Sequence, residues 1–204
     1  ACLKFARRYW YTQGAPLRTG FVAVEGAFSG RTMGALSVTH NEHYRLPFGP
    51  LIEPVTFVDP LRPDTLATAV TDRTAAIIAE PILGEGGIRP LSSQFAAAIN
   101  DACARTGALY IADEVQTGMG RLGTLFGYEQ FGFEPDAISM AKGLGAGAPL
   151  GAFLCKQEYA VLEPGDHGST FGGNALTTAA GWAGAKVVVD ENWSEKGAET
   201  GAYL

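Results

Sequence analysis

The residues that could do chemistry stand directly after short apolar runs. Glu80 follows the run AAIIA, Asp113 and Glu114 follow ALYIA, and Lys142 follows AISMA. Taking an ionised group out of water is costly unless it is paired or hydrogen-bonded. A single charge in such a place is most often a helix cap or a surface group. If the three runs are strands of one sheet, however, these charges of both signs form a constellation at one sheet edge.

Lys142 lies among small residues in the segment MAKGLGAGAP, which leave room for a planar group to approach its ammonium. We expect this lysine to be partly buried. Burial lowers the pKa of a lysine and makes its amine a competent nucleophile for Schiff-base formation. The alternative is a lysine that extends to the surface, or one that forms an ion pair with Asp113 or Glu80.

Asp113 opens the tetrad DEVQ. A buried carboxylate beside a pyridine nitrogen keeps that nitrogen protonated, so the ring can accept electrons. In the same tetrad, Gln116 could donate a hydrogen bond to a phenolate oxygen, and Val115 offers an apolar face. The segment DEVQTGMGR could also be an ordinary exit from a strand into a loop.

Two further segments could bind the charged ends of small molecules. The segment HGSTFGGN precedes a long helical pattern, and the hydroxyls of Ser169 and Thr170 suit a phosphate. It could equally be a helix start capped by Asn174. Arg31, after GAFSG, could hold a carboxylate through two parallel hydrogen bonds or be a solvated arginine. Phe28 could stack on a flat ring or belong to the core.

Composition excludes several classes of function. The formal net charge of −6 makes nucleic acid and anionic membranes poor partners. No apolar run approaches the roughly 18 residues of a membrane helix. The glycine-rich stretches fit neither nucleotide-binding fingerprint, and the scattered histidines predict no metal site. The three cysteines, Cys2, Cys103 and Cys155, are far apart and fit a reducing, cytoplasmic compartment.

The elements that position these residues alternate between strands and helices. Apolar runs that predict strands lie at 21–25, 75–79, 108–112, 137–140 and 151–154. Helical patterns lie at 31–38, 64–70, 92–106, 123–131, 156–162 and 174–190. The proline-rich segment 44–63 is predicted to be a surface connection. This alternation predicts an α/β fold with a mostly parallel central sheet and helices on both faces. Ligands of such sheets collect at the carboxyl ends of the strands.

Five motifs, in this order, resemble those of the class III, fold-type I aminotransferases that depend on pyridoxal 5'-phosphate (PLP). They are GAFSGRT (26–32), AEPILGEGG (79–87), ADEVQTGMGRLG (112–123), AKGLGAGAPLGAF (141–153) and HGSTFGGN (167–174). The acetylornithine and ornithine aminotransferase branch is the most similar, through DEVQTGMGRLGTLFGYEQFG and PGDHGSTFGGN.

The resemblance implies roles in cofactor binding. Lys142 would form the Schiff base with PLP and then move the proton between substrate and cofactor. Asp113 would pair with the pyridinium nitrogen, and Gln116 would contact the phenolic oxygen. Phe28 would stack on one face of the ring, with Val115 on the other.

The same resemblance places further residues around the cofactor and the substrate. Glu114 would belong to the cofactor-binding set, and Thr170 would reach the cofactor phosphate of the neighbouring subunit. Arg31 would hold the carboxylate of glutamate or 2-oxoglutarate, with Ser169 nearby. Glu85 would be an acidic partner on the substrate side.

The family pattern also implies a domain organisation. Residues 1–190 would form the PLP-binding large domain, and 191–204 would begin a smaller C-terminal domain. The chain opens inside one helical pattern and ends inside another, and the family's Gly–Ser/Thr phosphate loop would precede residue 1. We therefore expect a fragment truncated at both ends.

The implied activity is transfer of an amino group from N-acetylornithine, or an ornithine-like ω-amine, to 2-oxoglutarate. This reaction would belong to arginine biosynthesis in a cytoplasmic homodimer. Ser29 stands where relatives often carry His or Trp, which leaves the donor open. The alternatives are another class III reaction (on a diamine, 4-aminobutyrate or succinylornithine, or a 1,2-amino shift) and a non-catalytic truncated paralogue that serves as an interaction surface.

Overall fold

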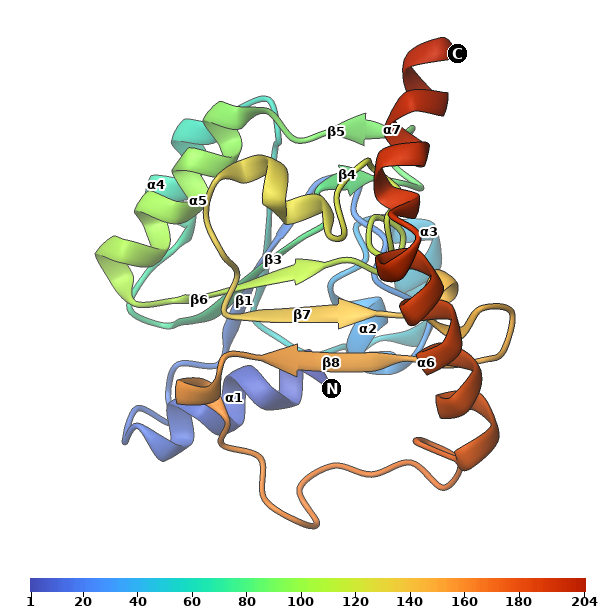
Figure 1. The fold of residues 1–204 in the computed structure, drawn as a ribbon. Coiled ribbons are helices and arrows are strands. Elements are labelled where there is room, and N and C mark those ends of the chain that lie inside the picture. Colours follow the sequence, from blue (N-terminus) through green and yellow to red (C-terminus); the bar gives the residue numbers. More distant parts are fainter.

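The computed structural model describes all 204 residues, and a six-stranded sheet forms its centre (Figure 1). The strand order across the sheet is β2-β1-β3-β6-β7-β8. Every neighbouring pair is parallel except β7 and β8. The strands are β1 (Gly20–Val24), β2 (Val55–Val58), β3 (Thr74–Ala79), β6 (Leu109–Asp113), β7 (Ala137–Met140) and β8 (Ala152–Cys155). The predicted α/β class with a mostly parallel sheet is confirmed.

Helices, short 3-10 turns and one small hairpin connect these strands. The helices are α1 (Cys2–Thr12), α2 (Met33–Ser37), α3 (Glu42–Arg45), α4 (Leu66–Ala69), α5 (Ser93–Thr106), α6 (Ala175–Asp190) and α7 (Trp193–Tyr203). The antiparallel hairpin pairs β4 (Ile82–Leu83) with β5 (Arg89–Pro90). None of the helices is long and apolar enough to cross a lipid bilayer.

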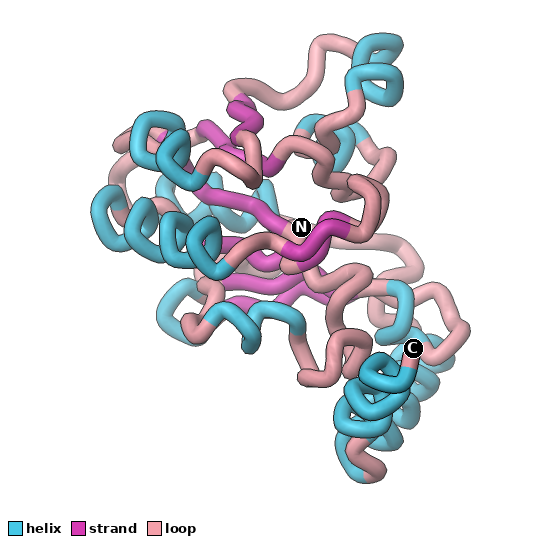
Figure 2. Tube along the Cα trace, turned by 90° about the horizontal axis from the view of Figure 1, so that it is seen from above, coloured by secondary structure: helices cyan, strands magenta, loops and turns pink.

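Helices cover both faces of the sheet (Figure 2). On one face α4 and α5 pack against alternate strand residues, among them Val22, Ile77 and Tyr110. On the other face α1 packs against the residues between them, such as Phe21 and Leu109. A strand buried on both sides needs apolar residues at every position, which explains the continuous apolar runs. Helices α6 and α7 lie beyond the end of the sheet toward which β6 and β7 point (Figure 1).

Helix α5 shows how local sequence sets an element of this fold. The Ser92 hydroxyl accepts a hydrogen bond from the N–H of Phe95 at 3.1 Å and so caps the helix start. Phe95 and Ile99 form its buried stripe. Gly107 ends the helix with a φ of 75°, which glycine adopts without steric cost.

The structure corrects the prediction for the proline-rich segment 44–63. This segment contains the edge strand β2 and part of α3, not only a surface connection. Among the residues of β2, only Val58 is fully buried. An edge strand of this kind lacks the continuous apolar run that reveals a central strand.

Two predicted helices are also wrong. The pattern at 123–131 gives a 3-10 turn over Gly127–Phe131, and the pattern at 156–162 gives one over Gln157–Tyr159. Gly123 has a φ of 90°, in the left-handed region that a right-handed helix cannot continue through. In the second segment the Tyr159 ring packs against Tyr9 of α1, 5.3 Å away, instead of extending a helical stripe.

Phe95 anchors α5 in the core with a side chain that is 0 % exposed. We expect Phe95→Ala to lower the free energy of unfolding by about 3–5 kcal/mol, because it removes apolar contacts and leaves a cavity. The control Gln94→Ala lies on the exposed side of the same helix and should change that free energy by about 0.5 kcal/mol or less. Urea unfolding followed by circular dichroism measures both. Equal losses would contradict the packing described for α5.

Candidate active site

Three neighbouring strands carry charged residues to one edge of the sheet. Glu80 follows β3, Asp113 is the last residue of β6, and Lys142 lies shortly after β7. Because β3, β6 and β7 are adjacent and parallel, their carboxyl ends meet at the same edge (Figure 1). Charges of both signs therefore gather where ligands bind in open α/β sheets.

Asp113 is a buried carboxylate held by its neighbours. It is 6 % exposed, and its Oδ1 accepts hydrogen bonds from the Ser139 hydroxyl at 3.0 Å and the Val115 N–H at 3.3 Å. Burial raises the pKa of Asp113, whereas these hydrogen bonds and the Lys142 charge lower it. The sequence analysis missed Ser139. The signal for it is a polar residue inside an apolar run, opposite Asp113 in the β6–β7 register.

A cavity of about 410 Å³ lies against Asp113. Val115 and Ile111 supply apolar wall, Ser29 and Ser139 add hydroxyls, and the first residues of α1 open onto the cavity. The N–H groups at the start of a helix favour anions. The cavity thus combines an apolar wall, a buried acid and an anion-favouring helix end.

Glu80 is the second buried acid of this edge. It is 3 % exposed, and its carboxylate accepts hydrogen bonds from the N–H groups of Phe28 at 2.9 Å and Gly84 at 3.2 Å. Burial raises the pKa of Glu80 to about 7, and the charge of Asp113 adds to this rise. The two backbone hydrogen bonds and the Lys142 charge act in the opposite direction.

Lys142 is exposed, so the predicted partial burial of this residue is wrong. It begins the 3-10 turn Lys142–Gly145, whose small residues cover little of its side chain. Its φ of 46° lies in the left-handed region, where a non-glycine residue is strained by about 1–3 kcal/mol and often serves a function. Its charge still acts on Asp113 and Glu80, since it lowers the pKa of both.

Glu114 differs from its neighbour Asp113 in where its carboxylate goes. It is 1 % exposed and accepts hydrogen bonds from the Thr117 hydroxyl and from the N–H groups of Gly127 at 2.9 Å and Tyr128 at 2.8 Å. These bonds close the loop that follows β6. The structure therefore assigns Glu114 to the support of this loop, rather than to the predicted contact with a cofactor.

Gln116 lies on the same loop and packs on the backbone of Gly84. A Cβ atom added at Gly84 would lie only 2.6 Å from the Gln116 carboxamide, so a side chain at this position would displace it. Val115, one residue earlier, lines the cavity at Asp113. The loop after β6 thus presents an apolar and a polar side chain in succession.

Phe28 and Glu85 line a second cavity, of about 450 Å³, together with Tyr44. Arg31 is exposed, and its guanidinium stacks over the Tyr44 ring, 3.6 Å from the ring centre, and lies 5.5 Å from that of Phe28. Stacking fixes the plane of a guanidinium and leaves its N–H edge free for a carboxylate.

Ser169 and Thr170 are exposed on the long loop between β8 and α6. Neither residue lines the cavity at Asp113. The preceding part of this loop is held to α1, because Arg8 pairs with Glu163 at 3.3 Å and with Asp166 at 3.2 Å. Within one chain, therefore, these hydroxyls are not joined to the acids at the strand ends.

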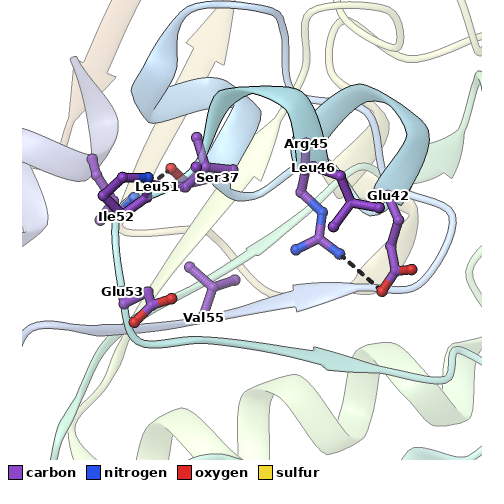
Figure 3. A pocket seen from close by; sticks show the side chains of 10 residues that line it. Ser37, Glu42, Arg45, Leu46, Leu51, Ile52, Glu53 and Val55 are labelled. Carbon is purple, nitrogen blue, oxygen red and sulfur yellow. Dashed lines mark hydrogen bonds and ion pairs between the residues drawn. The ribbon is translucent and has the colours of Figure 1, made fainter.

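Another cavity, of about 260 Å³, lies between α3 and β2 and contains none of the predicted site residues (Figure 3). Its polar groups interact within the chain. Arg45 faces Glu42 at 3.9 Å, and the Ser37 hydroxyl accepts a hydrogen bond from the Ile52 N–H at 2.9 Å. The cavity at Asp113 is the better candidate site, because it adjoins a buried carboxylate at the carboxyl edge.

Comparison with known proteins identifies the family. Residues 1–204 match the family model of class III aminotransferases. The chain is 47% identical to the acetylornithine aminotransferase of Archaeoglobus fulgidus, across 100% of the chain and 53% of that protein. The chain belongs to the class III aminotransferase family. It spans about half the length of the curated relatives that it matches.

Solved transaminase structures share the fold of this chain. The ornithine aminotransferase of Toxoplasma gondii ME49 matches with a TM-score of 0.92 and 31% identity, over 99% of this chain and 49% of that one. A PLP-bound amine transaminase from an uncultivated Pseudomonas species matches with a TM-score of 0.88 and 33% identity, over 99% and 52%.

Class III aminotransferases depend on PLP, and the residues of this chain fit that cofactor. The cavity at Asp113 offers an acid for a ring nitrogen and the Val115 side chain for a ring face. The start of α1 offers N–H groups for a phosphate. Lys142, at the end of the neighbouring strand, offers an amine.

The three hydrogen bonds of Glu114 suggest a stability test. We expect Glu114→Gln to lower the free energy of unfolding by about 1–3 kcal/mol, since an amide nitrogen would face buried N–H donors. Glu129→Gln is a suitable control, because its exposed carboxylate accepts a hydrogen bond from the N–H of Phe126 alone. Urea unfolding measures both variants. A loss for Glu114→Gln no larger than that of the control would show that Glu114 does not support the loop.

The raised pKa of Glu80 predicts how stability depends on pH. The folded protein holds this proton up to about pH 7, whereas an ordinary glutamate releases it near 4.5. Binding of this proton therefore stabilises the folded state fully below about pH 4.5, and the stabilisation is lost as the pH rises through about 7. We expect Glu80→Gln to flatten the fall in unfolding free energy across this window. Identical pH slopes for the wild type and the variant would contradict the shift.

Proposed function

We propose that the chain is the cofactor-binding part of a PLP-dependent aminotransferase that moves an amino group from N-acetylornithine, or an ornithine-like ω-amine, to 2-oxoglutarate. The observation that carries this proposal is the pair Asp113 and Lys142 at the ends of the adjacent strands β6 and β7. The high identity to acetylornithine aminotransferase of Archaeoglobus fulgidus supports this donor and a place in arginine biosynthesis.

In this proposal PLP supplies the electron sink that stabilises negative charge at the substrate carbon. Asp113 would pair with the ring nitrogen and keep it protonated. Burial raises the pKa of this carboxyl, and its hydrogen bonds from Ser139 and Val115 act against that rise. Lys142 would supply the amine that holds the cofactor aldehyde and the base that moves a proton at the substrate carbon. Val115, which lines the cavity at Asp113, would cover one ring face, and Phe28, which lines the adjoining cavity, would have to reach the other.

Other residues of the chain orient the reactants. Gln116, whose carboxamide packs against the Gly84 backbone, would donate a hydrogen bond to the phenolic oxygen of the cofactor. Arg31 holds the carboxylate of 2-oxoglutarate or glutamate, because its stacked guanidinium has a free edge. Glu85, in the adjoining cavity, acts on the substrate side, and Ser169 lies near the substrate.

We further propose a cytoplasmic homodimer. Thr170 is exposed and remote from its own cavity, which suits contact with the cofactor phosphate of a neighbouring subunit. Large apolar side chains of the C-terminal helices support a further contact surface, since Leu176 is 80% and Trp182 70% exposed. Residues 1–190 form the large domain, and 191–204 begin a smaller one.

The first experiment asks whether Lys142 binds PLP. We expect the chain to take up PLP with the visible absorption of a lysine Schiff base, because Lys142 and the buried Asp113 lie at the ends of adjacent strands. Borohydride reduction followed by peptide mapping should place the label on Lys142. Lys142→Ala should abolish the band, whereas Lys186→Ala, an exposed lysine of α6, should keep it.

The outcomes separate the alternatives. If the complete protein that carries this sequence is folded but takes up no PLP, the non-catalytic paralogue is favoured, and a label on another lysine contradicts the role of Lys142. The donor is then identified with the complete protein that carries this sequence. Glutamate formed from 2-oxoglutarate should be fastest with acetylornithine or ornithine, and faster turnover with 4-aminobutyrate or another diamine would overturn the proposed donor.

A further inference from the structure

Glu80 connects two loops that are far apart in the sequence. Its Oε1 accepts the N–H of Phe28, in the loop after β1, and its Oε2 accepts the N–H of Gly84, in the loop after β3. The residue is 3 % exposed, so water does not compete for these bonds. One carboxylate therefore fixes the separation of the two loops.

Both loops border the region around Asp113. The loop after β1 carries Ser29, which lines the cavity at Asp113, and Phe28, which lines the adjoining cavity. The Phe28 backbone places the ring that is proposed to cover the cofactor. The Gln116 carboxamide packs directly against the Gly84 backbone. A Cβ atom added at Gly84 would lie only 2.6 Å from that carboxamide. A shift of either backbone would move an aromatic wall or a hydrogen-bond donor.

We propose that Glu80 is a positioning residue of the active site, whose two oxygens hold Phe28 and, through Gly84, Gln116 in register with Asp113. This inference rests on the proposed function. Glu80 itself does not react, and it acts through the backbone of two loops.

The chemistry of the position requires a glutamate. Two backbone N–H donors need two acceptor oxygens, and a glutamine amide has one oxygen and would turn its own N–H groups toward a donor. An aspartate is one methylene shorter and does not span both loops from the end of β3. The charged groups that act on Glu80 are Asp113 and Lys142.

Amide hydrogen exchange on the full chain without cofactor, measured above the pKa of about 7 so that Glu80 is ionised, tests this role. In the wild type the N–H groups of Phe28 and Gly84 should be protected. Glu80→Gln should speed exchange of one of the two by about tenfold, the factor that corresponds to losing one charged hydrogen bond, and Glu80→Ala should speed both. If the substitutions instead destabilised the whole sheet, exchange would rise at the amides throughout β3, which would contradict a specific role of Glu80 in holding the two loops.

Glu25→Gln is the matched control, because Glu25 follows β1 as Glu80 follows β3 but holds neither loop. It should leave both amides protected. Unchanged exchange at Phe28 and Gly84 in Glu80→Ala would overturn the proposal. An increase in exchange at these two amides no larger than that in Glu25→Gln would also overturn it.

Added PLP gives a second readout. The visible circular dichroism of bound PLP reports how the ring is held, so it should weaken in Glu80→Gln, and PLP should dissociate about tenfold faster. Unchanged dichroism and dissociation would overturn the positioning of the site. If the complete protein that carries this sequence takes up no PLP, the proposed function fails, while the exchange result still decides whether Glu80 holds the two loops.

Discussion

Buried carboxylates at the carboxyl edge of the sheet must be satisfied by hydrogen bonds, and this requirement organises the rest of the site. Helices cover both faces of the sheet, and the acids at the ends of its central strands are buried as well. Glu80, Asp113 and Glu114 are all less than 7 % exposed. An isolated buried charge is costly, so each acid draws N–H or hydroxyl donors from the loops that follow the strands. The conformation of these loops therefore depends on the hydrogen bonds that their backbone N–H groups donate to the acids, as well as on the loop sequences.

The three acids differ in function because their donors differ. Glu114 accepts three hydrogen bonds from its own loop and supports that loop. Glu80 accepts one from each of two loops and therefore connects them. Asp113 accepts its hydrogen bonds at Oδ1 and borders a cavity, which leaves the carboxylate able to act on a ligand. Chemical type alone does not separate these roles.

The sequence predicted what local pattern determines. Apolar runs marked the central strands to within one residue, and Ser92 and Gly107 marked the ends of α5. It could not predict what depends on tertiary contacts. The edge strand β2 is too exposed to show an apolar run. Glu114 and Asp113 are adjacent in sequence, so only the fold reveals that one carboxylate supports a loop and the other borders the cavity. The exposure of Lys142 depends on which elements lie over its turn.

The residues of the candidate site divide into a buried set and an exposed set. The acids, Val115 and the Gly84 backbone are fixed by burial and hydrogen bonds, whereas Lys142 and Arg31 are exposed. Preorganised polar groups cost no reorganisation when charge develops beside them. The buried acids are therefore suited to stabilise charge on a bound ligand. The two cations differ from each other, because the Arg31 guanidinium is stacked on the Tyr44 ring whereas Lys142 extends from a turn open to solvent. Burial therefore separates the acids that hold the loops from the two cations that solvent reaches.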